Sequence, residues 1–132
     1  MKKAITFFFI GTMSAWAQLV VTVLPPKTTG TKAIVPLVLG NAFRESVASA
    51  RATMFLLDDK GSVVGQAVRW IIGGDTNHPP LAVGATNRFY FVVPTGGKPF
   101  VTNRLTVTQV NLPGGKRANP VTQVAVRSAA GP

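Results

Sequence analysis

Short runs of β-branched and aromatic residues, separated at close intervals by Gly, Pro, Asn and Asp, most constrain the fold of this chain. Such runs are typical of β-strands, and the residues between them supply turns. Helical periodicity is missing from the runs, and they do not alternate with helical segments. The pattern predicts seven strands, at Gln18–Leu24, Lys32–Leu39, Ala50–Leu57, Ser62–Ile72, Thr86–Val93, Asn103–Leu112 and Pro120–Arg127.

Seven short strands without intervening helices predict an all-β domain over residues 18–127. We expect a two-layer antiparallel sandwich of the immunoglobulin or fibronectin type III kind, with a small barrel as the alternative. Pro36 has no N–H to donate, so its strand is predicted to be an edge strand or to carry a bulge there. Residues 128–132 are predicted to be a flexible tail.

The clearest local unit is a β-hairpin that turns at Asp58-Asp59-Lys60-Gly61. Asp and Gly favour turns, and Gly61 adopts a positive φ without strain. Alternation predicts that one face of each strand is buried. The predicted core positions are Ala50, Ala52, Met54 and Leu56 on the first strand and Val64, Val68, Trp70 and Ile72 on the second, with Trp70 at the centre of the core.

The N-terminus has the three parts of a secretory signal peptide. Lys2 and Lys3 precede an uncharged, mostly apolar stretch at residues 4–13, and Ala15 and Ala17 form an A-x-A cleavage site. We therefore predict a signal peptide at 1–17, cut between Ala17 and Gln18. The alternative is a retained anchor, because the apolar run extends to Leu24, about the 20 residues that span a bilayer.

Removal of residues 1–17 leaves 115 residues, the size of one domain. Twelve basic and four acidic residues remain, a net charge of +8. The chain has no cysteine, so an exported form would depend on sheet hydrogen bonds and apolar packing for its stability. The predicted location is periplasmic or extracellular, and we expect no stable membrane span after cleavage.

The basic charge constrains the choice of partner. In the cell envelope, an acidic protein or an anionic polymer such as an acidic glycan is a suitable counter-ion, whereas export argues against nucleic acid. The arginines are dispersed along the chain, a pattern that favours a general role in solubility over one concentrated patch.

The sequence contains no constellation that predicts catalysis, a metal site or a cofactor. His78, with Asp75 nearby, is the one histidine, and this pair falls short of a ligand set. Asp58 and Asp59 lack the spacing of a calcium loop and are better explained by the turn. No serine lies in a G-x-S-x-G context. We expect a protein that is not an enzyme.

The hairpin also carries a family resemblance. Phe55-Leu56-Leu57-Asp58-Asp59, followed by Gly61 and Val63-Val64-Gly65, resembles the F-x-L-Y-D signature of bacterial FxLYD-type immunoglobulin-like domains. Val38–Asn41 upstream and Leu81–Phe91 downstream are similar to flanking elements of the family. The resemblance covers about residues 32–93, with Asp58 where the family has Tyr. It implies an extracytoplasmic immunoglobulin-like sandwich without catalytic residues.

These observations predict a non-catalytic binding module of the cell envelope or exterior that recognises a protein or an anionic glycan. The alternative is a structural subunit of an envelope or secreted assembly. The sequence leaves the oligomeric state open. The residues predicted to take part in surface recognition are Phe55, Arg69, Arg88 and Tyr90.

Overall fold

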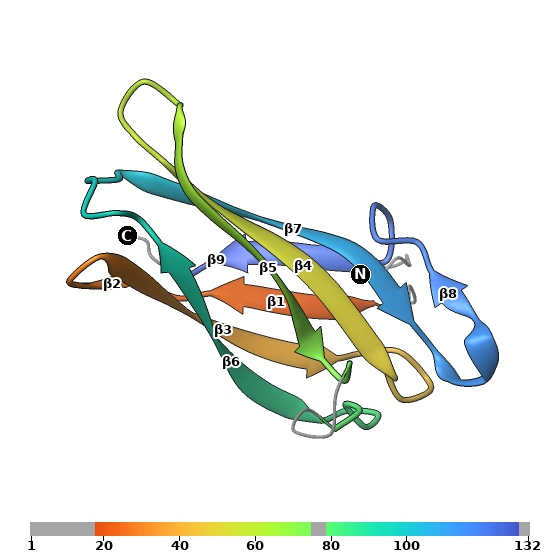
Figure 1. Ribbon diagram of the computed structural model, residues 1–132. Helices are drawn as coiled ribbons and strands as arrows, with labels where there is room; N and C mark the ends of the chain where they lie inside the picture. The colour runs from red at the N-terminus through yellow and green to blue at the C-terminus, as the bar shows by residue number, and fades with distance from the viewer. Residues whose placement is uncertain (1–17, 75–78, 130–132) are drawn as a thin grey trace, which may run out of the picture.

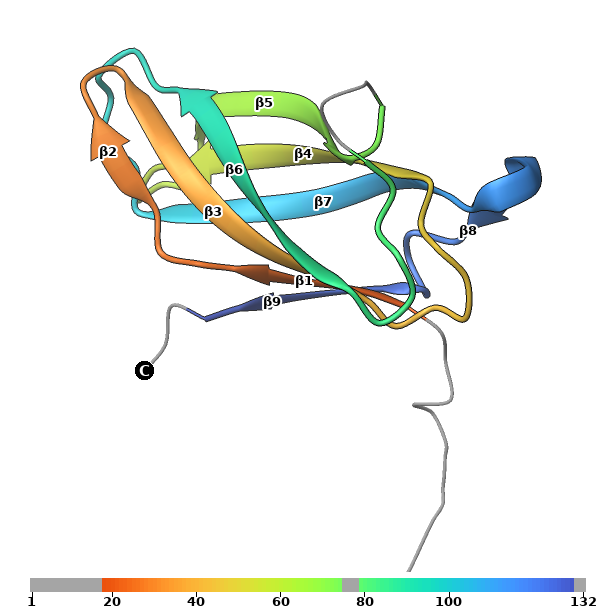
Figure 2. The same ribbon diagram turned by 90° about the horizontal axis from the view of Figure 1, so that it is seen from below.

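The computed structural model describes residues 18–74 and 79–129, and this part of the chain forms β-strands in two layers (Figure 1, Figure 2). The prediction of an all-β, two-sheet fold is therefore confirmed. The short strands β2 and β8 were not predicted. The strands of the described residues are β1 (Leu19–Val23), β2 (Lys27–Thr29), β3 (Lys32–Asn41), β4 (Ser49–Leu57), β5 (Val63–Ile72), β6 (Thr86–Pro94), β7 (Thr102–Asn111), β8 (Arg117–Ala118) and β9 (Val124–Ser128).

The two sheets divide the strands between them. In the first sheet β3 pairs with β6 along one edge and with both β1 and β2 along the other, and β9 lies beyond β1. The second sheet has the order β5-β4-β7-β8. The strand pairs are antiparallel except β1 with β9, which run parallel.

Pro36 lies in a central strand, so the prediction of an edge strand or a bulge is wrong. The neighbouring edge of β3 changes partner at this residue: β2 pairs up to Ile34 and β1 begins at Leu37. The carbonyl of Pro36 accepts a hydrogen bond from Leu24 N at 2.9 Å, so its nitrogen faces the same junction. A missing N–H costs little at a break in the ladder, and β3 therefore accommodates the proline.

Alternation along the strands builds the core between the two sheets. Ala50, Ala52, Met54 and Leu56 of β4 are fully buried, as predicted. On β6, Phe91 is fully buried and Phe89 packs partly buried against the core. Their rings meet edge to face, with centroids 5.6 Å apart. Apolar burial of this kind is the main stabilising term in a domain without disulfides.

Trp70 is not a core residue, and this prediction is wrong. It lies opposite Arg51 on the outer side of the second sheet and is half-buried, while Ala67, Ile71 and Ile72 are buried. The register shifts between Ala50 and Arg51, which leaves Ile71 as an extra residue on β5. Counting alternate residues back from Ile72 without allowing for this bulge assigns both Trp70 and Val68 to the inner face. The core prediction for Val68, which lies opposite Thr53 and is 39% exposed, is therefore also wrong.

The β4–β5 turn is held by the side chain of Asp58, as the sequence predicts. Its Oδ1 accepts hydrogen bonds from the backbone N–H groups of Lys60 and Ser62, both at 2.9 Å. Gly61 adopts a φ of 80°, the conformation that glycine takes without strain.

The end of the chain also differs from the prediction. The last strand begins at Val124 rather than near Pro120 and extends through Ser128, the first residue of the predicted tail. Ala129 N donates a hydrogen bond to Val23 O at 2.9 Å. Residues 130–132 lie outside the described residues.

Candidate functional site

The outer side of the second sheet carries two arginine–aromatic pairs. Phe55 of β4 lies opposite Arg104 of β7. The guanidinium carbon of Arg104 is 5.4 Å from the centroid of the Phe55 ring. Arg51 of β4 lies opposite Trp70 of β5, with 5.9 Å between its guanidinium carbon and the centroid of that ring. We call these four residues the arginine–aromatic face.

The alternation of side chains along β4 explains why these residues lie on the outer side of the sheet. Because the four buried residues of β4 occupy alternate positions, Arg51, Thr53 and Phe55 point to the opposite side of the sheet. The neighbouring strands add Val68 and Thr106, which lie opposite Thr53. Val68 is 39% exposed, so an apolar patch accompanies the two arginines.

The charges on the strands have one sign. None of the nine strands of the described residues contains Asp or Glu, whereas together they contain eight Lys or Arg residues. Glu45, which precedes β4, pairs with Lys116 at 2.9 Å on the surface. Asp58 binds the backbone of its own turn. The arginine–aromatic face is therefore positively charged, and the strands of its sheet supply no carboxylate to neutralise it.

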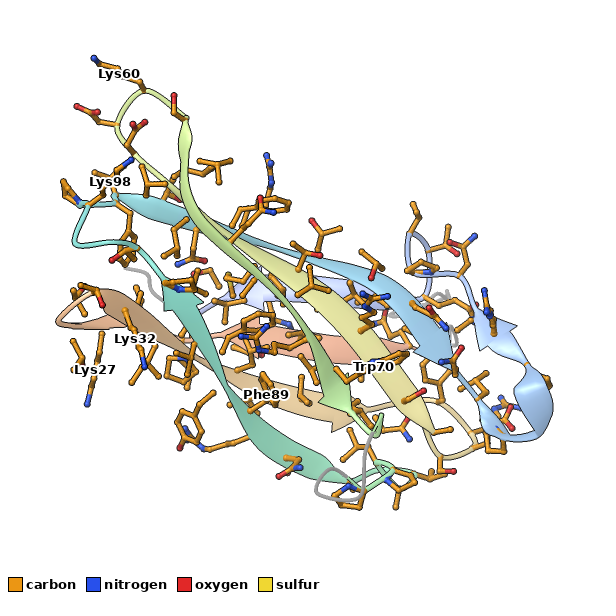
Figure 3. All side chains as sticks on the ribbon, viewed as in Figure 1. Lys27, Lys32, Lys60, Trp70, Phe89 and Lys98 are labelled. Carbon is orange, nitrogen blue, oxygen red and sulfur yellow. The ribbon has the colours of Figure 1, made fainter. Side chains whose placement is uncertain are left out.

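Four of the five lysines of the described residues lie toward one end of the molecule, and the fifth, Lys116, pairs with Glu45. Lys27, Lys32, Lys60 and Lys98 lie toward the end that carries the β2–β3 turn, the β4–β5 turn and the β6–β7 connection (Figure 3). Arg51 and Arg104 instead lie within the sheet surface. The cations are thus spread over the molecule, as their dispersal along the sequence indicated, but the arginines on the sheet are held beside aromatic rings.

Stacking determines what these arginines can do. A guanidinium above an aromatic ring gains about 0.5–1 kcal/mol at an exposed site and keeps its N–H donors free at its edge. Its planar fork matches a carboxylate, sulfate or phosphate, and a side chain already held in place loses less entropy on binding. The aromatic rings add a flat apolar surface for a ligand's ring or alkyl groups.

The four residues predicted for surface recognition lie on different parts of the molecule. Phe55 belongs to the arginine–aromatic face. Arg69 is an exposed residue of β5 opposite Ala52, and its Nη1 donates a hydrogen bond to Val68 O at 2.8 Å. Arg88 and Tyr90 lie together on the outer side of the first sheet, opposite Val38 and Pro36 of β3.

Arg51, Trp70 and Arg104 were not among the residues predicted for surface recognition. The parity of β4 could have grouped Arg51 with Phe55, but Trp70 was assigned to the core because of the unrecognised bulge. Arg104 meets Phe55 through the pairing of β4 with β7, strands far apart in the sequence. No local pattern reveals that pairing.

A second apolar surface covers the outer side of the first sheet. Tyr90 is 57% exposed and Val92 37% exposed on β6, and Ile34 and Val38 of β3 lie beside them partly buried. A strand that is apolar on both sides is typical of one covered on both faces. Arg88 contributes positive charge to this surface.

Several predictions fall outside the described residues. Ala17 of the cleavage site and both Asp75 and His78 are among them, whereas Gln18 directly precedes β1. Within residues 18–74 and 79–129 no group of three or more His, Cys, Asp or Glu side chains is placed to hold a metal ion. In the same residues, no helix has the length and hydropathy needed to cross a bilayer.

Comparison with known proteins adds no further assignment. No protein-family model, curated protein or solved structure matches this chain.

Proposed function

We propose that this protein is a non-catalytic binding module that recognises an anionic partner through the arginine–aromatic face. The observation that carries the proposal is the pair of ring-stacked arginines on a sheet whose strands contain no acidic residue. Arginine stays protonated at any physiological pH, so it serves binding better than proton transfer. An acidic protein and an anionic glycan both offer the charge and the flat surfaces that this face suits.

We further infer export to the periplasm or the exterior. The signal-like pattern of residues 1–17 supports this, and so does the place of β1, which begins at Leu19, two residues after the predicted cut. Leu19, Val21 and Val23 are buried against the other strands. These side chains are already used in the sheet, which favours cleavage over an anchor that extends to Leu24.

The particular domain class that we propose is the FxLYD-type immunoglobulin-like sandwich. Its support is the Phe55–Gly65 hairpin and the division of strands, with β1, β3 and β6 in one sheet and β4, β5, β7 and β8 in the other. The grouping of β1, β3 and β6 in one sheet and of β4 and β7 in the other is similar to the A-B-E and C-F groups of an immunoglobulin-like sandwich. The parallel pairing of β9 with β1 is a departure from a simple antiparallel sandwich.

The test uses the exported protein as purified, with poly-L-glutamate and polygalacturonate as probes. We expect both Arg51→Gln and Arg104→Gln together to weaken binding by at least about tenfold, because anion contacts of this kind are worth more than 1.4 kcal/mol in sum. Lys27→Gln with Lys60→Gln removes the same charge from the lysine-rich end and serves as the control. Equal weakening by both pairs would mean that net charge alone drives binding and would contradict the proposal.

A structural subunit is the second candidate, favoured by the apolar outer surface of the first sheet. Self-association through Tyr90, Val92 and Ile34 would bury it. Light scattering of the purified protein across a wide concentration range separates the two candidates. A monomer at every concentration argues against a structural subunit, and a growing oligomer supports it.

A further inference from the structure

The C-terminal part of the chain leaves one edge of β7 largely open. β8 pairs with β7 at Val110 and Asn111, and the chain then crosses to the other sheet, where β9 pairs with β1. A tight turn makes the crossing: Val121 N donates to Asn119 Oδ1 and Gln123 N donates to Asn119 O, both at 2.8 Å. Between Thr102 and Gln109, no strand of the described residues pairs with this edge of β7.

The open edge presents backbone groups in a known direction. In an antiparallel strand, residues whose side chains point to one face direct their N–H and C=O groups to one edge. Val110 is buried and pairs toward β8, where Leu112 N donates to Lys116 O at 2.8 Å. Leu105 and Val107 are buried on the same face, so their backbone groups point to the open edge.

A groove runs beside this edge, between β7 and β9. Its volume is about 440 Å³, and Val23, Phe100, Leu105 and Val126 are among its lining residues. Val126 is 44% exposed within it, so apolar surface is available to a ligand. The groove also includes residues Arg104 and Arg127 and contains no acidic residue.

On the other side of the sandwich, β5 and β6 meet at Gly65. A side chain at Gly65 of β5 would meet Pro94 O of β6 at 2.5 Å, so these two edges are already in contact. The groove described above lies on the β7–β9 side, where the last strand has changed sheets.

We propose that an extended acidic segment of a partner protein binds in this groove as an additional strand along β7. Main-chain hydrogen bonds to Leu105 and Val107 supply affinity, and alternate side chains enter the groove. The intervening side chains point to the outer side, where Arg104 lies, which selects Glu or Asp at those positions. The preferred ligand is thus a segment in which apolar and acidic residues alternate.

The net charge of the protein favours a different protein, rather than a second copy of this chain, as the molecule that binds along β7. After loss of residues 1–17 each copy carries +8, so two copies repel each other at an edge that already holds arginines. A negatively charged segment is instead attracted to these arginines. The inference rests on the proposed function for the sign of the partner's charge.

The test uses a short synthetic peptide of alternating valine and glutamate, and an isomer with its glutamates in one block. We expect the alternating peptide to bind tighter than the isomer and to slow amide hydrogen exchange at Leu105 and Val107 by about tenfold or more, as a new strand pair protects edge amides. Unchanged exchange at both amides in the presence of bound peptide overturns the inference.

A variant pair separates the groove from charge alone. Val126→Glu places a carboxylate in the groove and is expected to weaken peptide binding by at least about tenfold. Val121→Glu makes the same change at an 85% exposed residue of the crossing turn, outside the groove, and is expected to leave affinity within about twofold. Equal weakening overturns the inference.

The two proposals fail in different ways. If neither peptide binds and poly-L-glutamate does not bind, the anionic partner itself is wrong. If both peptides bind equally, without protection at Leu105 and Val107, anion binding stands and the added strand does not.

Discussion

The contact between β5 and β6 is tested most sharply by Gly65→Ala. An alanine Cβ at this position would lie 2.5 Å from Pro94 O and 3.3 Å from a methyl group of Val93. The closer atom belongs to the backbone, so no side-chain rotation relieves the clash. The strands must move apart, and overpacking of this kind costs about 1–3 kcal/mol.

An opposing term reduces the net effect. Replacing a strand glycine by alanine gains about 0.5–1 kcal/mol by restricting the unfolded chain. We therefore expect Gly65→Ala to lower the free energy of unfolding by about 1–2 kcal/mol. Gly40 of β3 provides the control, because the nearest atoms to its added Cβ are 3.9 Å away. Gly40→Ala is expected to be neutral or to stabilise by up to about 1 kcal/mol.

Urea unfolding followed by tryptophan fluorescence and circular dichroism measures both variants. A difference of about 2 kcal/mol between them corresponds to about 8 °C in Tm for a domain of this size. Equal stability of the two variants would refute the reasoning, because it would mean that the β5 and β6 edges do not meet. The contrast between the β5–β6 side, where the sheets meet, and the β7–β9 side, which holds the groove, would then be lost.

Three further predictions concern the core, a buried polar side chain and export. Phe91→Ala is expected to cost about 3–5 kcal/mol in urea unfolding and Trp70→Ala under about 1.5 kcal/mol, and similar costs would contradict the outward position of Trp70. Asn41→Ala is expected to cost about 2–3 kcal/mol in urea unfolding, because the side chain donates to Glu45 O and Leu81 O and accepts from Phe43 N; a loss below about 0.5 kcal/mol would contradict this. Intact mass of the exported protein is expected to match residues 18–132, and Ala17→Leu to retain the leader, since the peptidase needs a small residue there; an uncut wild-type chain would contradict cleavage.

Local patterns were enough to predict most strands and one face of the core. In β4 the alternation runs without interruption from Ala50 to Leu56, so parity alone identified the buried residues. Asp58 and Gly61 identified the turn because their chemistry is local. These features depend on residues close together in the sequence.

Features that depend on partner strands could not be predicted in this way. The bulge that turns Trp70 outward is a property of the β4–β5 register, and Pro36 is tolerated because two different strands meet its edge. The sequence predicts a strand from Pro120, but the chain makes a tight turn after Asn119 and β9 begins only at Val124. The sheet that β9 then joins is set by tertiary packing. The candidate site was therefore only partly foreseen: Phe55 was selected, while its partner Arg104 was not.

Trp70 offers a direct probe of whether an anionic partner binds the arginine–aromatic face. The chain has two tryptophans, and predicted cleavage removes Trp16, so emission from the exported form arises from Trp70. We predict a saturable change in this emission when poly-L-glutamate is added, abolished by about 0.5 M salt because exposed charges are then screened. Binding of the probe without any change in Trp70 emission would contradict the claim.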